Sequence, residues 1–221
     1  MEREADRGLE LLRETGLAAI LRGVPARAAE PLAQALFDGG VRVLEVTLNT
    51  EGAPAMIAHL RERFAGRLWV GAGTVVDAAG AETAAAAGAA FFVTPNFDPK
   101  VISYGRERGL PVMAGAFTPT EILAALRAGA AVVKIFPSSG VGPRYFQELR
   151  GPYGDMPLMA VGGVTVANAG AFLRAGAMAL GVGSQLADRA LLAAGDFGAL
   201  RARAAQFADA VRRARTNAAA T

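Results

Sequence analysis

The sequence contains no cysteine and one histidine, His59. Without thiols the chain cannot form a disulfide framework, a cysteine nucleophile or a cysteine-ligated zinc site. One imidazole cannot supply the nitrogen ligands that a transition metal usually takes, so no metal site is expected. His59 falls in the middle of a helical pattern, and we interpret it as a surface residue.

Long apolar runs and clustered charges are also missing. No stretch of about 18 uncharged apolar residues occurs, so no membrane span is expected. Residues 1–14 are rich in Arg and Glu and have no apolar segment. They therefore do not resemble a secretory signal, and a cytoplasmic location is expected. The net charge of +3 is spread along the chain, which argues against nucleic-acid binding.

Lysine is much scarcer than arginine. Among 23 basic residues the only lysines are Lys100 and Lys134. Lys134 lies inside an apolar segment, Ala-Val-Val-Lys-Ile-Phe. An ammonium group is costly in such surroundings unless it is paired or loses its proton. Lys134 therefore stands out as a candidate for chemistry.

A pattern of strand plus helix repeats along the chain, at intervals of roughly 20 to 27 residues. Four strands follow a phrase that begins with glycine, at Gly39, Gly88, Gly129 and Gly176, and each glycine is predicted to end a helix in the left-handed conformation. Strands are predicted at Leu17–Leu21, Val41–Leu48, Leu68–Ala72, Ala90–Thr94, Pro111–Ala114, Ala131–Phe136, Pro157–Val161 and Ala179–Val182. Helices are predicted at Glu4–Thr15, Pro31–Phe37, Ala53–Phe64, Ala79–Ala87, Pro99–Arg108, Pro119–Arg127, Val166–Arg174 and Phe197–Arg215.

Eight short apolar strands alternating with helices predict an α/β fold with a parallel sheet covered on both faces. We expect the closed form, a (β/α)₈ TIM barrel with an extra N-terminal helix, and keep an open doubly wound sheet as the alternative. A chain of 221 residues suits one such domain. The expected division is an N-terminal helix over residues 1–16 and a barrel over 17–217, without a linker.

Two charged residues are predicted to face the barrel interior. Because side chains alternate along a strand, Lys134 shares a face with Val132 and Phe136, and Glu45 shares a face with Val43 and Thr47. Burial lowers the pKa of a lysine, and a neutral amine can attack a ketone to form an imine. A carboxylate nearby can move protons for it. The alternative is a purely structural ion pair.

The remaining candidates follow other strands, at the barrel end where chemistry is expected. Thr74, after a Gly-Ala-Gly turn, offers a hydroxyl to a carboxylate or carbonyl. Arg22 ends the first strand, where it would hold an anion or simply face solvent. The loops after the last two strands contain four residues that predict a phosphate site or, alternatively, tight turns without a ligand. These four are Gly162, Gly163, Gly183 and Ser184.

The combined motifs resemble the bacterial KDPG/KHG aldolases, class I aldolases of 2-keto-3-deoxy sugar acids that use no metal and no cofactor. The resemblance runs from about Leu17 to Phe207 in order and with few gaps. The matching phrases are Leu44-Glu45-Val46-Thr47-Leu48, Gly71-Ala72-Gly73-Thr74-Val75, Val93-Thr94-Pro95-Asn96, Lys134-Ile135-Phe136-Pro137 and Ala160-Val161-Gly162-Gly163-Val164.

The resemblance implies roles for these residues. Lys134 would form the Schiff base and Glu45 would shuttle protons. Thr74 would hold the substrate carboxylate, and Arg22 matches an arginine of the family. Phe136, Pro95 and Pro137 would pack around the imine, and the four loop residues would bind phosphate. The family is generally trimeric, so a homotrimer is expected.

One position departs from the gluconate enzymes of the family. Those enzymes carry arginine after the Leu-Glu-Val-Thr-Leu phrase, where this chain has Asn49. The phrase is similar to that of the 6-phosphogalactonate branch, and so are Lys134–Ser139 and Gly142–Tyr145. The expected substrate is 2-dehydro-3-deoxy-6-phosphogalactonate, giving pyruvate and D-glyceraldehyde 3-phosphate.

Alternative functions differ in substrate or in reaction class. The nearest are cleavage of 2-dehydro-3-deoxy-6-phosphogluconate or of 4-hydroxy-2-oxoglutarate by the same chemistry. A sugar-phosphate isomerase or epimerase barrel is less expected, because an epimerase of this type needs metal-binding histidines that the chain lacks. A non-catalytic sugar-phosphate binder would have no use for Lys134 and Glu45.

Overall fold

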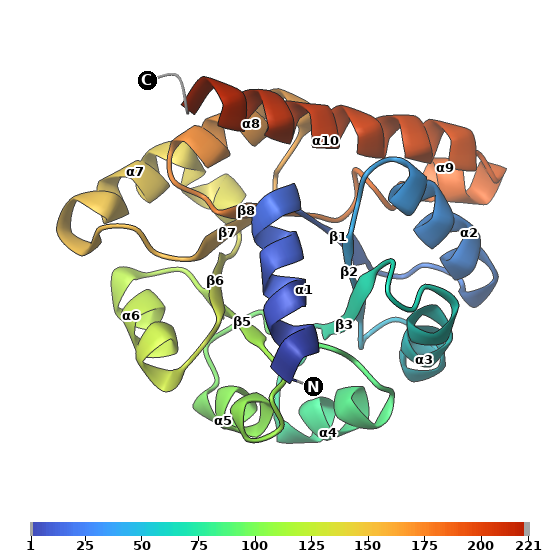
Figure 1. The fold of residues 1–221 in the computed structure, drawn as a ribbon, viewed down its shortest axis with the longest axis horizontal. Coiled ribbons are helices and arrows are strands. Elements are labelled where there is room, and N and C mark those ends of the chain that lie inside the picture. Colours follow the sequence, from blue (N-terminus) through green and yellow to red (C-terminus); the bar gives the residue numbers. More distant parts are fainter. Residues whose placement is uncertain (1, 219–221) are drawn as a thin grey trace.

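The computed structural model describes residues 2–218, with eight parallel strands that close into a barrel (Figure 1). Each strand pairs with its neighbours in chain order, and β1 closes the ring by pairing with β8. The (β/α)₈ prediction is therefore confirmed. The strands are β1 (Leu17–Leu21), β2 (Val43–Thr47), β3 (Trp69–Gly73), β4 (Phe92–Val93), β5 (Val112–Ala116), β6 (Val132–Ile135), β7 (Leu158–Val161) and β8 (Ala179–Val182).

Helices surround the barrel and fill the intervals between strands (Figure 1). They are α1 (Glu2–Thr15), α2 (Ala26–Asp38), α3 (Ala53–Arg63), α4 (Ala78–Ala86), α5 (Pro99–Glu107), α6 (Pro119–Ala128), α7 (Gly142–Tyr153), α8 (Val166–Arg174), α9 (Arg189–Ala194) and α10 (Phe197–Ala218), with a short 3₁₀ turn η1 (Ser138–Gly140). Among these described residues, no helix is both long and apolar enough to cross a membrane.

The apolar residues form two layers, as alternation along the strands requires. The outer layer lies between strands and helices and includes Val133 and Ile135 of β6. The inner layer fills the barrel and includes Val132 of the same strand. Lys134 and Glu45 lie on the inner-facing positions, and both are 2% exposed. The predicted facing of the two strands is thus confirmed.

Helix α1 covers the N-terminal end of the barrel, and Figure 1 shows it lying across the ring of strands. Its Leu12 is fully buried in the inner layer. Gly8 lies so close to the indole of Trp69 at the start of β3 that a Cβ atom would overlap the ring. An ion pair of 2.5 Å between Glu4 and Arg61 ties α1 to α3. The barrel is therefore closed at this end and can be entered only from the other.

Some predicted boundaries are wrong. Helix α2 begins at Ala26 instead of Pro31, so that Pro31 lies inside it. The buried stripe of α2, which includes Ala28 and Ala29, extends the helix through the proline. Before β2 the left-handed residue is Gly40, with φ of 100°, whereas Gly39 has φ of −80°. The prediction also named no helix at α7 or α9.

Four of the eight strands, β2, β4, β6 and β7, are shorter than predicted, and β4 contains only Phe92 and Val93. The residues that flank these strands remain buried and still form single backbone hydrogen bonds to the neighbouring strands, such as Ala90 N to Val70 O at 3.0 Å and Thr94 N to Met113 O at 3.1 Å. Two helix starts agree with the sequence prediction: Asp98 and Thr118 cap α5 and α6, and each is followed by a proline at the first helical position.

Candidate active site

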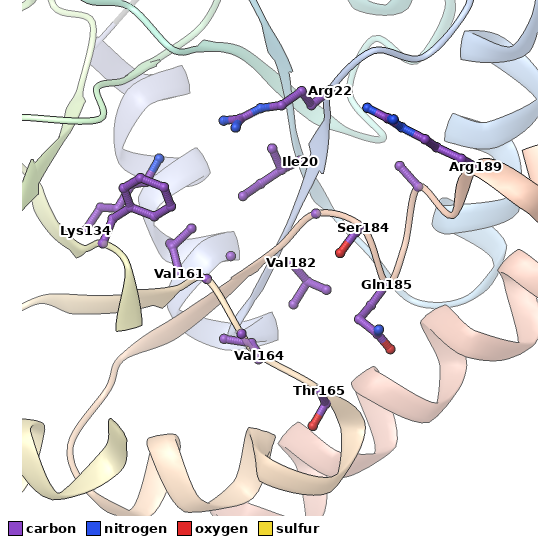
Figure 2. Close-up of a pocket in the computed structure, with 16 residues that line it drawn as sticks. Ile20, Arg22, Lys134, Val161, Val164, Thr165, Val182, Ser184, Gln185 and Arg189 are labelled. Atoms are coloured by element: carbon purple, nitrogen blue, oxygen red, sulfur yellow. The ribbon is translucent and has the colours of Figure 1, made fainter. Parts of the chain in front are cut away.

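A cavity of about 410 Å³ opens at the C-terminal ends of the strands (Figure 2). It brings together residues that follow β1, β6, β7 and β8. Its lining is Ile20, Arg22, Lys134, Phe136, Val161, Gly162, Gly163, Val164, Thr165, Gly181, Val182, Gly183, Ser184, Gln185, Ala187 and Arg189. The lining includes three cationic side chains and no carboxylate, so the cavity suits an anionic ligand.

The amine of Lys134 lies inside this cavity. Its Nζ is 5.0 Å from the centre of the Phe136 ring, and the side chain forms no ion pair within 4.0 Å among the described residues. Burial holds the pKa of Lys134 below its usual value, and Arg22 lowers it further, while Glu45 raises it. Burial is the largest cause, so the amine loses its proton more easily than an exposed lysine.

Glu45 is the second ionisable group of the barrel interior. Its side chain packs against Gly73 of β3, and its Oε1 atom is buried without a hydrogen-bond partner. Burial raises the pKa of the Glu45 carboxyl, opposed by the positive charges of Lys134 and Arg22. A buried carboxyl with an unpaired oxygen and a raised pKa can both accept and donate a proton next to the cavity.

The side chains of Arg22 and Thr74 contact each other at the C-terminal ends of β1 and β3. The Arg22 Nη2 atom donates a long hydrogen bond of 3.4 Å to Thr74 Oγ1. Thr74 has φ of 55°, in the left-handed region that β-branched residues rarely adopt. Such backbone strain persists where the surroundings enforce it, and it is frequent at ligand sites. The pair presents a cation and a hydroxyl beside Lys134, which suits a carboxylate.

The loops after β7 and β8 supply a large part of the cavity lining. Gly162 and Gly163 adopt φ of 95° and 71°, and a Cβ atom on Gly163 would approach Ser139 to 2.6 Å. Glycine is therefore required for the loop to run this close to η1. Ser138, which is fully buried, joins the two by donating to Ile135 O at 2.8 Å and accepting from Val161 N at 3.1 Å.

Several predicted site residues lie outside the cavity lining. Glu45 and Thr74 lie next to it, through the contacts described above. Asn49 is exposed in the turn after β2, and its side chain forms no hydrogen bond with residues 4–216. Pro95 packs with its backbone on Gly115 of β5, at a position where a Cβ atom on the glycine would overlap it.

Sequence reasoning missed three polar residues that do line the cavity: Thr165, Gln185 and Arg189. It also missed Thr94, a buried residue whose hydroxyl donates to Asn96 O at 2.5 Å and accepts from Gly115 N at 2.9 Å. This pair of bonds fixes the loop that carries Pro95. The available signal was the position of Thr94 directly after β4 and of Thr165 and Gln185 in the loops after β7 and β8, whereas Arg189 begins α9.

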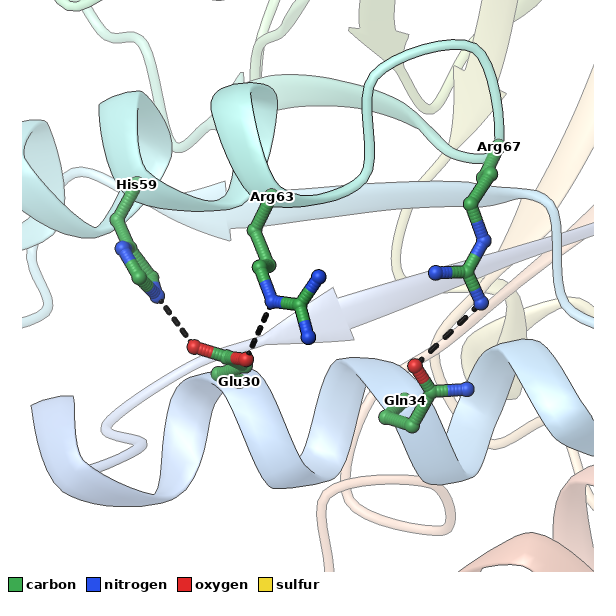
Figure 3. Close-up of polar contacts among 5 residues, drawn as sticks. All are labelled: Glu30, Gln34, His59, Arg63 and Arg67. Atoms are coloured by element: carbon green, nitrogen blue, oxygen red, sulfur yellow. Dashed lines mark hydrogen bonds and ion pairs between the residues drawn. The ribbon is translucent and has the colours of Figure 1, made fainter.

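The donor set gives no support for a metal. The described residues contain no group of three or more histidine, aspartate or glutamate side chains able to hold an ion. His59 lies on α3, exposed, with Nε2 at 2.7 Å from Glu30 of α2, as Figure 3 shows. It belongs to a surface cluster with Arg63 and is remote from the cavity.

Comparison with known proteins gives concordant results. The family model described as KDPG and KHG aldolase matches residues 9–202. A probable 2-dehydro-3-deoxy-6-phosphogalactonate aldolase of Rhizobium meliloti is 37% identical over 174 residues, 78% of this chain and 82% of that protein. A 2-dehydro-3-deoxy-phosphogluconate aldolase of Treponema pallidum is 38% identical over 170 residues, 76% of this chain and 80% of that protein.

The fold agrees with these relatives. A solved structure described as native KDPGal superposes with a TM-score of 0.85 and 34% sequence identity, covering 90% of this chain and 96% of that one. The similarity therefore extends over the whole barrel and includes the strands that carry Lys134 and Glu45.

Proposed function

This chain belongs to the KDPG and KHG aldolase family, and we propose that it cleaves 2-dehydro-3-deoxy-6-phosphogalactonate to pyruvate and D-glyceraldehyde 3-phosphate. The observation that carries the proposal is the buried amine of Lys134, which lies in a cationic cavity and has a pKa below that of an ordinary lysine. That is the environment in which a lysine acts as a nucleophile toward a ketone.

The first half of the reaction builds an electron sink. The neutral Nζ of Lys134 attacks the C2 ketone carbon, and the resulting carbinolamine loses water to give a protonated imine. Glu45 takes the proton of the C4 hydroxyl, through a water or directly. The C3–C4 bond then breaks, its electron pair moves into the imine, and the aldehyde product leaves.

The second half restores the enzyme. The enamine on Lys134 takes a proton at C3, for which the carboxyl of Glu45 is the source. Water hydrolyses the imine, releasing pyruvate and the free amine. Glu45 thus receives one proton and returns one, and a raised pKa suits both directions because the protonated and ionised forms are then closer in free energy.

The two anionic ends of the substrate are held on opposite sides of Lys134. Thr74 and Arg22 bind the carboxylate, since they supply a hydroxyl and a guanidinium beside the amine. Phe136 and Pro95 pack around the imine. The backbone N–H groups of the loops after β7 and β8 bind the phosphate at Gly162, Gly163, Gly183 and Ser184.

Reductive trapping tests this proposal. Borohydride added in the presence of pyruvate is expected to fix one pyruvyl adduct, which peptide mass spectrometry places on Lys134. The Lys134→Ala variant should form no adduct and lose cleavage activity. Lys100→Ala is the matched control, because Lys100 is the other lysine and lies exposed on α5. An adduct on Lys100, or full activity of Lys134→Ala, would overturn the mechanism.

The choice of substrate has its own test. Asn49, in place of the arginine of gluconate enzymes, supports the galactonate series, whereas the gluconate relative from Treponema pallidum is as similar in sequence as the galactonate one. The two substrates differ at C4 alone, so both are assayed side by side with the same preparation. The proposal expects a higher kcat/KM for the galactonate substrate, and equal values would show that Asn49 does not mark the branch.

Two further features belong to the proposal. Activity should survive dialysis against EDTA, because the imine on Lys134 supplies the electron sink. Chelator-sensitive activity would indicate a metal-dependent aldolase instead.

We also propose a homotrimer, as is general in the family. Light scattering on a sizing column should then give three times the chain mass of 22.7 kDa.

A further inference from the structure

The cavity has a cation at its outer edge that neither the proposed mechanism nor the phosphate loops use. Arg189 lines the cavity together with Ser184 and Gln185. Figure 2 shows its side chain extending from α9 toward Arg22. Its Nη2 atom stands 4.0 Å from the place of a Cβ atom on Gly23, the residue next to Arg22. The guanidinium therefore reaches across the cavity mouth.

The backbone of Arg189 is rigidly connected to the loop after β8. Leu186 and Ala187 both donate their backbone N–H groups to the carbonyl of Gly183, at 2.9 Å each. Asp188 then caps α9 by accepting from Ala190 N at 2.9 Å and Leu191 N at 3.1 Å. The hydrogen-bonded turn that contains Gly183 and Ser184 therefore also fixes the backbone position of Arg189.

The guanidinium itself has no partner within the described residues. Its chain neighbour Asp188 is already engaged, because its carboxylate caps α9 and lies 3.1 Å from Arg203. No ion pair or hydrogen bond of the Arg189 side chain is found among residues 4–216, and the cavity lining contains no carboxylate. Arg189 is exposed and retains its full capacity to bind an anion.

The positions of the other cations decide which anion it binds. In the proposed mechanism Lys134 reacts at C2. Arg22 is hydrogen-bonded to Thr74, and both are assigned to the substrate carboxylate. Arg189 enters the cavity at the start of α9, after the loop that carries Ser184, and this loop and the loop after β7 supply only neutral N–H and O–H donors. A phosphate carries close to two negative charges at neutral pH, and guanidinium matches its oxygens with two parallel hydrogen bonds.

We propose that Arg189 is a further phosphate-binding residue of this protein, which closes over the terminal phosphate of the substrate from the mouth of the cavity. The proposal rests on the proposed function for the identity of the substrate. The added element is a charged side chain on α9, which completes a phosphate site that would otherwise consist of uncharged loop donors.

The test compares ligands with and without the phosphate. Arg189→Gln removes the charge and keeps a polar side chain, and Arg189→Lys keeps the charge without the fork of donors. Arg127→Gln is the matched control, since Arg127 is an exposed arginine in the last turn of α6 and lines no cavity. Each protein is assayed with 2-dehydro-3-deoxy-6-phosphogalactonate, with the same sugar acid lacking phosphate, and for competitive inhibition by inorganic phosphate.

The expected result is selective. For Arg189→Gln, KM for the phosphorylated substrate and the inhibition constant of inorganic phosphate should both rise by about tenfold to a hundredfold, because one charge-assisted pair is lost. Arg189→Lys should fall between this variant and the wild type. The KM for the unphosphorylated sugar acid and pyruvate trapping on Lys134 should not change. The Arg127→Gln variant should behave as wild type throughout.

Three outcomes would overturn the inference. Unchanged constants in Arg189→Gln would show that the loops hold the phosphate alone. An equal rise with both sugar acids would show a general effect on the cavity. Failure of inorganic phosphate to bind the wild-type protein, followed directly by phosphorus NMR, would remove the site itself. If the wild type traps no pyruvate, the proposed function fails, while phosphate binding in the Arg189 variants still decides the present inference.

Discussion

The carboxylate of Glu45 lies against the backbone of Gly73, so closely that a Cβ atom on the glycine would overlap Oε1. The two residues lie on the neighbouring strands β2 and β3, where the register pairs Glu45 with Gly71 and Gly73 with Thr47, so the contact is diagonal. The absent side chain of Gly73 leaves the space that Glu45 occupies. The position of the Glu45 carboxylate is therefore set by a glycine on another strand.

Gly73→Ala is expected to displace the Glu45 carboxylate, because the flexible end of that side chain yields more easily than the backbone. We predict a fall in kcat of about a hundredfold, as for a catalytic group moved by about 1 Å. Pyruvate trapping on Lys134 should persist. Steady-state assays and mass spectrometry measure the two effects. The prediction fails if kcat is unchanged, or if circular dichroism shows that the variant does not fold.

The pH dependence of imine formation should report the lowered pKa of Lys134. Attack on pyruvate needs the neutral amine, so the trapping rate rises as pH increases through the pKa and then levels off. Because burial lowers that pKa, the plateau should begin below the usual lysine value of 10.5. Short reductive pulses across the pH range measure it. A rate that still rises up to 10.5 would contradict the prediction.

Glu45→Gln should shift the same profile in a defined direction. The negative charge of Glu45 raises the pKa of Lys134, so removing the charge leaves the lowering by burial and by Arg22 unopposed. The plateau should therefore begin at lower pH than in the wild type. Cleavage should fall by about a hundredfold to ten-thousandfold, since general acid–base transfer is lost. A shift to higher pH would show that Glu45 does not act on the amine through its charge.

Replacing Thr74 by glycine should stabilise the fold and weaken pyruvate binding. Relief of a left-handed β-branched residue is worth about 1–3 kcal/mol, and added glycine flexibility in the unfolded chain offsets about 0.4–1 kcal/mol. Thr74→Gly should therefore increase the free energy of unfolding by about 1 kcal/mol and weaken pyruvate binding. Thr74→Ser, which keeps the hydroxyl, is the control and should retain binding. Urea unfolding and pyruvate-dependent trapping separate the two quantities. A destabilised Thr74→Gly would disprove the strain.

Gly8→Ala should reverse the usual rule for helices. Alanine inside a helix normally stabilises it by about 1 kcal/mol over glycine. At Gly8 the methyl group would overlap the indole of Trp69, a bulky ring that cannot swing aside inside the barrel, so a loss of about 1–3 kcal/mol is expected. Gly198→Ala, exposed in the first turn of α10, is the control and should not destabilise. Equal unfolding free energies for both variants would contradict the packing.

Much of the fold follows from local patterns. Short apolar runs separated by helical segments are enough to predict eight parallel strands, and alternation within β6 and β2 places Lys134 and Glu45 inside the barrel. Proline after a capping residue marks the starts of α5 and α6. The first residue of α2 could not be located in this way, because burial of its apolar stripe outweighs the local signal of Pro31.

The sequence by itself determined the alternating strands and helices, the inward lysine and carboxylate, and the glycines of the loops, since each depends on neighbours within a few residues along the chain. Only the tertiary structure decided which distant groups meet. Arg22 and Thr74, 52 residues apart, come together at 3.4 Å. Arg189 reaches the cavity from a helix of six residues that carries almost no periodic signal. Closure of the ring brings the C-terminal ends of all eight strands to one rim of the barrel. Local sequence patterns carry no information about which of these ends come into contact.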